Sequence, residues 1–162
     1  MDTRSFPMNP HSVAVMLRPD GRVFIEVYSQ PQSGAPTLDG LPLVLQGADD
    51  PKVLGQGVLD ALERSTYDVM PAPDHRNNPM VKELLAWAGA RNWKAYTKGS
   101  KSVSVFSRYS VAPPATVNIT PDKRDSDGGF SSISEERRVD VAFTGAEELG
   151  RLVQEALKIA RA

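Results

Sequence analysis

Residues able to carry out chemistry are few and scattered in this sequence of 162 residues. It contains no cysteine, which excludes disulfides, thiolate catalysis and cysteine-ligated zinc. Its two histidines, His11 and His75, lie far apart in polar surroundings. A catalytic or metal-binding histidine needs other groups that converge on it, and the sequence places none beside either one. Both are therefore predicted to be solvated loop residues.

The run DSDG, from Asp125 to Gly128, resembles part of a calcium-binding loop. With Gly128 at the sixth loop position, Lys123 falls at the first position and Ser134 at the twelfth. Both positions should supply oxygen ligands, and a lysine would repel the ion. The run is therefore predicted to be a polar turn, and no metal or other cofactor is expected.

Other catalytic patterns are absent or incomplete. No GxSxG sequence marks a serine nucleophile, and Gly55-Gln56-Gly57 lacks the third glycine of a dinucleotide-binding fingerprint. Paired acids occur at positions 49–50, 135–136 and 147–148, but adjacent side chains point in different directions. The protein is therefore predicted not to be an enzyme. A hydrolase with an unrecognised site is the alternative, and loss of turnover on replacing a single serine or histidine would reveal it.

Basic residues alternate with aromatic residues between positions 91 and 108. The basic residues are Arg91, Lys94, Lys98, Lys101 and Arg108, and the aromatic residues are Trp93, Tyr96 and Phe106. Such a mixture can form a platform for nucleic acid, so a small nucleic-acid-binding module is an alternative function. It can equally be a solvated sheet face beside core aromatics. The formal net charge of −1 provides no bulk attraction to nucleic acid or anionic lipid, and neither partner is expected.

The first element predicted along the chain is a β-hairpin. Residues 12–17 and 22–29 are rich in β-forming residues and flank the turn sequence Pro19-Asp20-Gly21. In the second strand Val23, Ile25 and Val27 share one face, while aromatic residues lie on the other. We therefore expect both faces of this hairpin to be at least partly covered.

Two helices and several strands are predicted in the middle of the chain. One helix should run from Pro51 to about residue 65, capped by Asp49 or Asp50, with Val53 among its buried residues. Its two glycines, at positions 55 and 57, predict close packing against a neighbouring element. A second helix should begin at Asn78-Pro79 and end at Gly89. Residues 93–96, 102–109, 116–120 and 130–133 are predicted to be strands, and 122–129 a charged loop.

The C-terminal segment is predicted to be a strand followed by a helix. Alternation over 139–143 indicates the strand, and Thr144 with Glu147 forms a capping-box pattern for a helix reaching Ala160. The sequence LGRLVQEALKIAR at positions 149–161 repeats LGQGVLDALER at positions 54–64. The two units are therefore expected to be a pseudo-symmetric pair of strand-helix elements.

These elements predict the domain organisation and fold class. Residues 1–11 should be a flexible N-terminal arm, and residues 12–162 a single α+β domain with a largely antiparallel sheet and about three helices packed on one side. The apolar runs are far too short to cross a membrane, and residues 1–12 have no apolar signal core. A cytoplasmic location is therefore expected.

Four sequences carry a resemblance to a known family. They are AGARNWKAYTKGSKSVSV at 88–105, LGQGVLDALERS at 54–65, DGGF at 127–130 and ELGRLVQEAL at 148–157. In their order along the chain, these segments resemble the CdiI immunity proteins of contact-dependent growth inhibition (CDI), and the resemblance covers residues 38–161. The resemblance implies a cytosolic, non-enzymatic protein that binds and neutralises the C-terminal toxin domain of a cognate CdiA effector, often a nuclease.

The family provides no catalytic residues to transfer, but electrostatics indicates a contact surface. A nuclease toxin should have a positive substrate groove, so its inhibitor should present carboxylates. The densest acids that helix capping does not explain, expected to be exposed, are Asp122, Asp125, Asp127, Glu135 and Glu136. They are the predicted toxin-binding residues. The alternative is a solvated loop, because four basic residues, at 123, 124, 137 and 138, lie among them.

Overall fold

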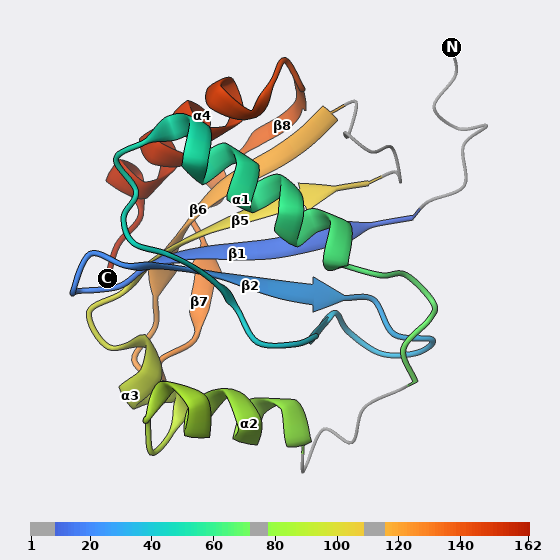
Figure 1. The fold of residues 1–162 in the computed structure, drawn as a ribbon, viewed down its shortest axis with the longest axis vertical. Helices are drawn as coiled ribbons and strands as arrows, with labels where there is room; N and C mark the ends of the chain where they lie inside the picture. Colours follow the sequence, from blue (N-terminus) through green and yellow to red (C-terminus); the bar gives the residue numbers. More distant parts are fainter. Residues whose placement is uncertain (1–8, 72–77, 109–115) are drawn as a thin grey trace.

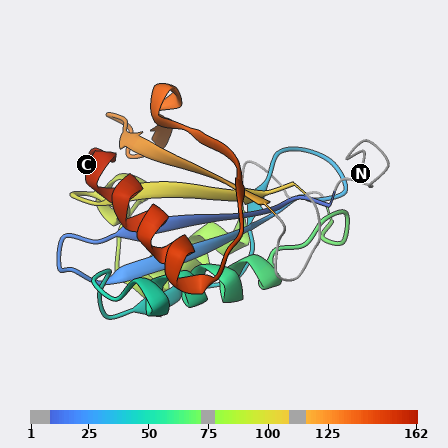
Figure 2. The same ribbon diagram turned by 90° about the horizontal axis from the view of Figure 1, so that it is seen from above.

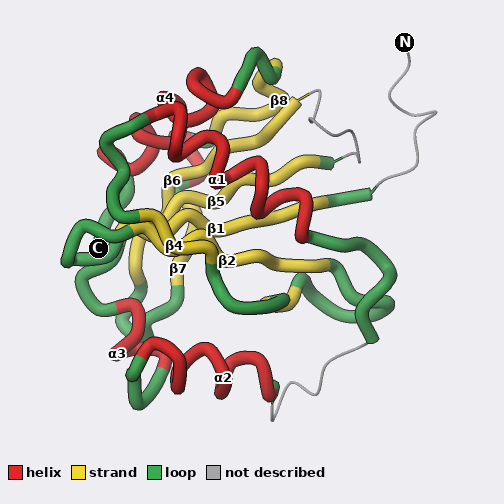
Figure 3. Tube along the Cα trace, viewed as in Figure 1, coloured by secondary structure: helices red, strands yellow, loops and turns green. Residues whose placement is uncertain are grey.

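The computed structural model of the chain describes residues 9–71, 78–108 and 116–162 (Figure 1). Most of the predicted N-terminal arm, together with His75, lies outside these residues. The described part is an antiparallel eight-stranded sheet with helices, which confirms the predicted α+β class. Figure 3 shows the strands running side by side through the middle of the molecule, with helices above and below.

The central strands follow the order β3-β2-β1-β5-β6-β7. The strands are β1 (His11–Leu17), β2 (Val23–Ser29), β3 (Thr37–Leu38), β4 (Leu43–Leu45), β5 (Lys101–Ser107), β6 (Thr116–Arg124), β7 (Phe130–Ser132) and β8 (Arg138–Ala142). Each outer edge carries two short strands end to end. β4 and β3 pair with successive parts of β2, and β8 and β7 pair with successive parts of β6.

The predicted hairpin is the first two strands of this sheet. Its turn closes with hydrogen bonds from Gly21 N to Arg18 O (3.0 Å) and from Arg18 N to Arg22 O (2.9 Å). Gly21 has a φ of +91°, which other residues rarely adopt, and Asp20 accepts a hydrogen bond from Arg22 N at 3.0 Å. β1 and β2 then pair in register from Leu17–Val23 to Ser12–Tyr28.

The helices are α1 (Pro51–Arg64), α2 (Pro79–Ala88), α3 (Trp93–Thr97) and α4 (Ala146–Ile159), with a short 3₁₀ helix, η2 (Ser134–Glu136). The predicted caps of the first two are confirmed. Asp50 accepts from Lys52 N at 3.0 Å, Asn78 accepts from Met80 N at 3.0 Å, and Gly89 ends α2 at φ +69°.

Three local predictions were wrong. Residues 93–96 form a helix rather than a strand, because Asn92 caps that segment by accepting from Ala95 N at 2.8 Å. The capping box at Thr144 is absent, since α4 starts after Gly145 without a side-chain cap. Val53, predicted to be buried in α1, is half exposed.

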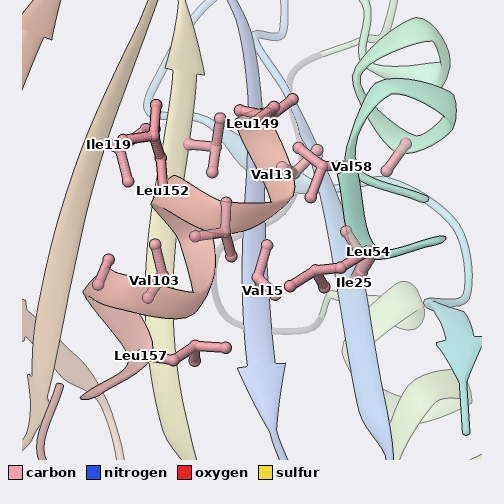
Figure 4. Close-up of a cluster of buried hydrophobic side chains, with 14 of the residues drawn as sticks. Val13, Val15, Ile25, Leu54, Val58, Val103, Ile119, Leu149, Leu152 and Leu157 are labelled. Atoms are coloured by element: carbon pink, nitrogen blue, oxygen red, sulfur yellow. The ribbon is translucent and has the colours of Figure 1, made fainter. Parts of the chain in front are cut away.

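Helices cover both faces of the sheet, not one face as predicted. α1 and α4 pack on one face over a core that includes Val13, Ile25 and Val105. Figure 4 shows leucines of α4 and α1 pointing into this core. α2 and α3 cover the other face, where Phe24 and Tyr96 belong to a second buried cluster. Alternation along β2 accounts for this arrangement, because its odd-numbered residues meet the first pair of helices and its even-numbered residues the second.

α1 and α4, the repeated helices, pack directly against each other (Figure 2). A Cβ atom added to Gly55 would overlap the carbonyl group of Ala146, and one added to Gly150 would overlap that of Pro51. The two contacts are equivalent. Each glycine lies four residues after the first residue of its own helix and contacts the first residue of the other helix. This confirms the predicted close packing and gives the sequence repeat a physical cause.

Candidate functional site

The predicted acidic surface loses one member in the structure. Asp122 is 3% exposed, so the expectation that it lies on an exposed loop was wrong. β6 continues past Pro121 to Arg124, and this places Asp122 within the sheet. Burial raises the pKa of its carboxyl group to about 6, against hydrogen bonds that favour the charged form, including one from Ser104 Oγ at 2.9 Å. A toxin could not contact this group without disrupting the sheet.

Asp125 and Asp127 lie in the turn between β6 and β7. Asp125 accepts a hydrogen bond from Ser131 Oγ at 2.5 Å, and Asp127 accepts one from Gly129 N at 2.9 Å. Gly128, at φ +91°, lies against α3, where its carbonyl oxygen accepts from Thr97 Oγ1 at 2.6 Å. The turn is therefore a defined structure that presents Asp127 to solvent, as the predicted polar turn requires.

Glu135 and Glu136 are exposed on η2, at the other end of β7. β7, whose three residues span about 10 Å, lies between the two groups of acids. Basic residues lie among them, and Arg138 forms an ion pair with Glu155 at 2.9 Å. The structure therefore arranges four of the five predicted acids as two pairs on a surface of mixed charge, in which Asp127, Glu135 and Glu136 are exposed and Asp125 is half-buried.

The basic and aromatic residues between 91 and 108 do not form a stacking platform in the part of the chain that the structure describes. Tyr96 is fully buried, and its ring lies 5.2 Å from that of Trp93, which is half-buried. A base could not stack on rings that already pack against the protein. Lys101 lies on β5, apart from the lysines of α3 and its flanks.

Three of these basic residues instead line a pocket of about 730 Å³. Arg91, Lys94 and Lys98 are joined there by two residues that the sequence patterns did not indicate, Arg18 from the hairpin turn and Arg124 from the end of β6. Sequence reasoning missed them because they are far from α3 in the chain. The remaining lining residues are small or neutral, namely Ala88, Gly89, Ala90, Asn92 and Ala95.

A buried polar network lies beneath this pocket, on the α2–α3 side of the sheet. Glu26 is 3% exposed and accepts hydrogen bonds from Tyr96 Oη at 3.0 Å and Tyr28 Oη at 3.2 Å. Burial raises the pKa of its carboxyl group to about 7, although these two hydrogen bonds and the charge of Arg18 favour the ionised form. The Arg18 guanidinium lies 5.1 Å from the centre of the Phe24 ring.

No metal centre is found in residues 9–71, 78–108 and 116–162. No group of three potential ligands among them could hold a metal ion. His11, predicted to be a solvated loop residue, begins β1 and has Nδ1 3.1 Å from Leu62 O, so it ties the sheet to the end of α1. No helix in the described ranges is long and apolar enough to span a membrane.

Comparisons with known proteins identify the family. The family model described as "CDI immunity protein" (CdiI) matches residues 19–160. No curated protein sequence matches the chain. Among solved structures, a protein of unknown function from Neisseria meningitidis, NMB0488, superimposes with a TM-score of 0.73 at 21% identity, covering 94% of this chain and 96% of that one.

A second similar structure is a chain of the CdiA-CT/CdiI toxin and immunity complex from Yersinia pseudotuberculosis. Its TM-score is 0.68 at 16% identity, and the match covers 92% of this chain and 96% of that chain. At such identities the two structures establish a shared fold. The family model covers most of the sequence, and its members are non-enzymatic inhibitors. The chain belongs to the CdiI family of CDI immunity proteins.

Proposed function

We propose that the protein binds the C-terminal toxin domain of a cognate CdiA effector in the cytoplasm and neutralises it. The observation that carries this proposal is the family match over residues 19–160. The fold similarity to a chain of a toxin and immunity complex supports it. A binding role also agrees with the exposed carboxylates of Asp127, Glu135 and Glu136, which can form polar contacts with a partner.

The proposed toxin is a nuclease, and the proposed contact surface comprises Asp125, Asp127, Glu135 and Glu136. A nuclease groove is positive, so carboxylates at its rim would accelerate association and select the cognate partner. Asp122 is left out of this surface because its side chain is buried. The neighbouring basic residues would then contribute to specificity, because they would repel toxins whose charge pattern does not match that of this surface.

The first experiment tests complex formation. The protein is co-expressed with the C-terminal toxin domain of the proposed cognate CdiA effector, and the two are purified through a tag on the toxin. We expect a stoichiometric complex in size-exclusion chromatography and loss of nuclease activity in vitro. A toxin domain that elutes alone and keeps its activity in the presence of excess protein would contradict the proposal.

A second experiment tests the surface. Glu135→Lys/Glu136→Lys should slow association with the toxin about tenfold at low salt and less at physiological salt, because exposed charges are screened. Asp125→Asn/Asp127→Asn removes charge but keeps the oxygen acceptors of the turn. Glu63→Lys, at an exposed acid on α1, is the control and changes the net charge by +2, as Asp125→Asn/Asp127→Asn does. Association rates that equal the wild-type rate in both double variants would exclude this surface while leaving toxin binding itself intact.

A further inference from the structure

We infer that the pocket between the end of α2, α3 and the end of β6 binds a small, multiply charged phosphate compound, such as a diphosphate or triphosphate chain. The inference does not depend on toxin binding. Its basis is the charge, rigidity and shape of the pocket.

The charge around the pocket is uniformly positive. Five cationic residues line it and no acidic residue does: Arg18, Arg91, Lys94, Lys98 and Arg124. None of them forms an ion pair with a carboxylate in the described ranges, whereas arginines elsewhere do, such as Arg22 with Asp20 at 2.9 Å. Glu26 lies near Arg18 and offsets part of its charge from within the core. A protein of net charge −1 thus gathers unpaired cations around one concave site.

Two of the five cations are fixed in position by neutral groups. Arg124 donates from Nε to Thr97 Oγ1 at 3.1 Å and from Nη2 to Lys94 O at 2.8 Å, so its charge is held without being neutralised. Arg18 donates from Nη1 to the carbonyl oxygen of Tyr96 and to Ser100 Oγ. The buried Nε of Arg18 finds no acceptor among the described residues. Guanidinium groups held in this way match oxyanions at little cost in side-chain entropy.

The other lining residues restrict the class of ligand. Alanines, a glycine and Asn92 offer no aromatic ring for a base to stack on and no large apolar side chain to bury a hydrophobic group. A single carboxylate supplies one negative charge, whereas each terminal phosphate group supplies nearly two. A compact phosphate chain therefore matches five cations better than an acidic side chain or a nucleobase would.

The test is isothermal titration of the wild-type protein with sodium pyrophosphate and sodium tripolyphosphate at constant ionic strength. Sodium sulfate is the reference anion. We expect both phosphate chains to bind at least tenfold more tightly than sulfate. Arg91→Ala/Lys98→Ala removes two exposed cations of the pocket and should weaken this binding at least tenfold. Lys52→Ala/Lys158→Ala, two exposed lysines of α1 and α4, is the control and should bind as the wild type does.

Other outcomes would overturn the inference. Phosphate chains that bind no more tightly than sulfate would exclude the site, as would equal weakening in the pocket and control variants. A hexaglutamate peptide and a single-stranded RNA are titrated in parallel. Binding of either one through Arg91 and Lys98, without binding of the free phosphate chains, would assign the pocket to that macromolecule instead. Urea unfolding of both double variants identifies any loss of binding that is due to misfolding.

Discussion

Glu26 places an ionisable carboxyl group inside the sheet, between β2 and the helices α2 and α3. Two tyrosine hydroxyls satisfy its oxygens, and Arg18 supplies a nearby positive charge. Desolvation nevertheless has the largest effect, and it raises the pKa of Glu26 from 4.5 to about 7. The folded protein therefore holds a proton at this site at pH values where the unfolded chain has released it.

The free energy of unfolding should consequently fall as pH rises. The contribution of Glu26 is fully present below about pH 4.5 and is lost as pH rises through 7. The rise in the pKa of Glu26 from 4.5 to about 7 corresponds to a fall of roughly 3 kcal/mol in the free energy of unfolding between pH 4.5 and pH 8. Asp122, whose pKa is raised from 3.8 to about 6, acts in the same direction. Urea unfolding across this pH range measures the slope.

Replacement of Glu26 by glutamine separates this effect from other titrations. Glu26→Gln keeps an oxygen acceptor for one tyrosine and cannot ionise, so the variant should lose most of the pH dependence and be more stable than the wild type at pH 8. Asp122→Asn should remove a smaller part of the slope. An unchanged slope in Glu26→Gln would show that this carboxyl group titrates normally in the folded protein.

The burial and the contacts of single residues were the hardest features to predict from the sequence. The number and types of acids between 122 and 136 were visible in the sequence, but the burial of Asp122 depends on how far β6 extends past Pro121. The sequence around Arg18 and Arg124 gave no sign that they share a pocket with α3. Contacts between residues so far apart in the chain follow from the folded sheet, and local patterns do not contain them.

At the level of elements, the contact between α1 and α4 depends on the lack of side chains at two positions. The overlaps expected at Gly55 and Gly150 are with backbone atoms, which cannot rotate away. Gly57 differs, because its nearest neighbours are the side-chain ends of Ile25 and Leu45, each 3.1 Å from an added Cβ.

Alanine substitutions should therefore have different effects at these glycines. In an isolated helix, a change from glycine to alanine is stabilising by about 1 kcal/mol. Gly55→Ala and Gly150→Ala should instead lower the free energy of unfolding by about 1–3 kcal/mol, because the helices must move apart. Gly57→Ala is the control, and its effect should stay within about 1 kcal/mol of zero. Urea unfolding followed by circular dichroism decides between them, and a gain in stability for Gly55→Ala would refute the tight contact.

Most elements with local signals were predicted correctly, although the capping-box pattern at Thr144 does not form in the structure. The hairpin turn, the caps at Asp50 and Asn78 and the end of α2 at Gly89 depend on residues within a few positions of one another. The strand predicted over residues 93–96 contains Trp93 and Tyr96, both of which have high β-propensity. The structure has a helix there instead, because Asn92 caps its first turn and the helix packs against Gly128.

For the molecule as a whole, α4 contributes to the same core as α1 and the four central strands β1, β2, β5 and β6. Leu149, Val153 and Leu157 are buried against that face of the sheet. Beyond α4, Arg161 continues the contact by donating from its N to Asp122 O at 3.0 Å and accepting from Arg124 N at 2.9 Å. The end of the chain is thus held against β6 by backbone hydrogen bonds (Figure 2).

Two truncations should have very different consequences. A chain that ends at Thr144 lacks α4, exposes one face of the core and should show no cooperative unfolding transition. A chain that ends at Ala160 loses only the two hydrogen bonds of Arg161, and its free energy of unfolding should fall by about 1–3 kcal/mol. Differential scanning calorimetry of the two truncated chains shows whether each one unfolds cooperatively and how much stability it has lost. A sharp transition in the chain without α4 would mean that the sheet is stable without that helix.

The placement of helices on both faces was the main feature of the whole molecule that the sequence did not predict. The aromatic residues on the second face of β2 suggested some covering there. α2 was nevertheless expected on the same face of the sheet as α1, because its own sequence does not indicate which face it packs on. That choice depends on the path of the chain across the sheet edge.

The contact between α1 and α4 also bears on the order in which the protein can fold. It joins helices that begin at Pro51 and Ala146, so the core on this face forms only through contacts between residues distant along the chain, and such contacts slow folding. During synthesis on the ribosome, β1, β2 and α1 emerge long before their partner helix does. The nascent chain therefore exposes the core face that α4 covers until residues 146–159 have left the exit tunnel, and the native surface forms only after that moment.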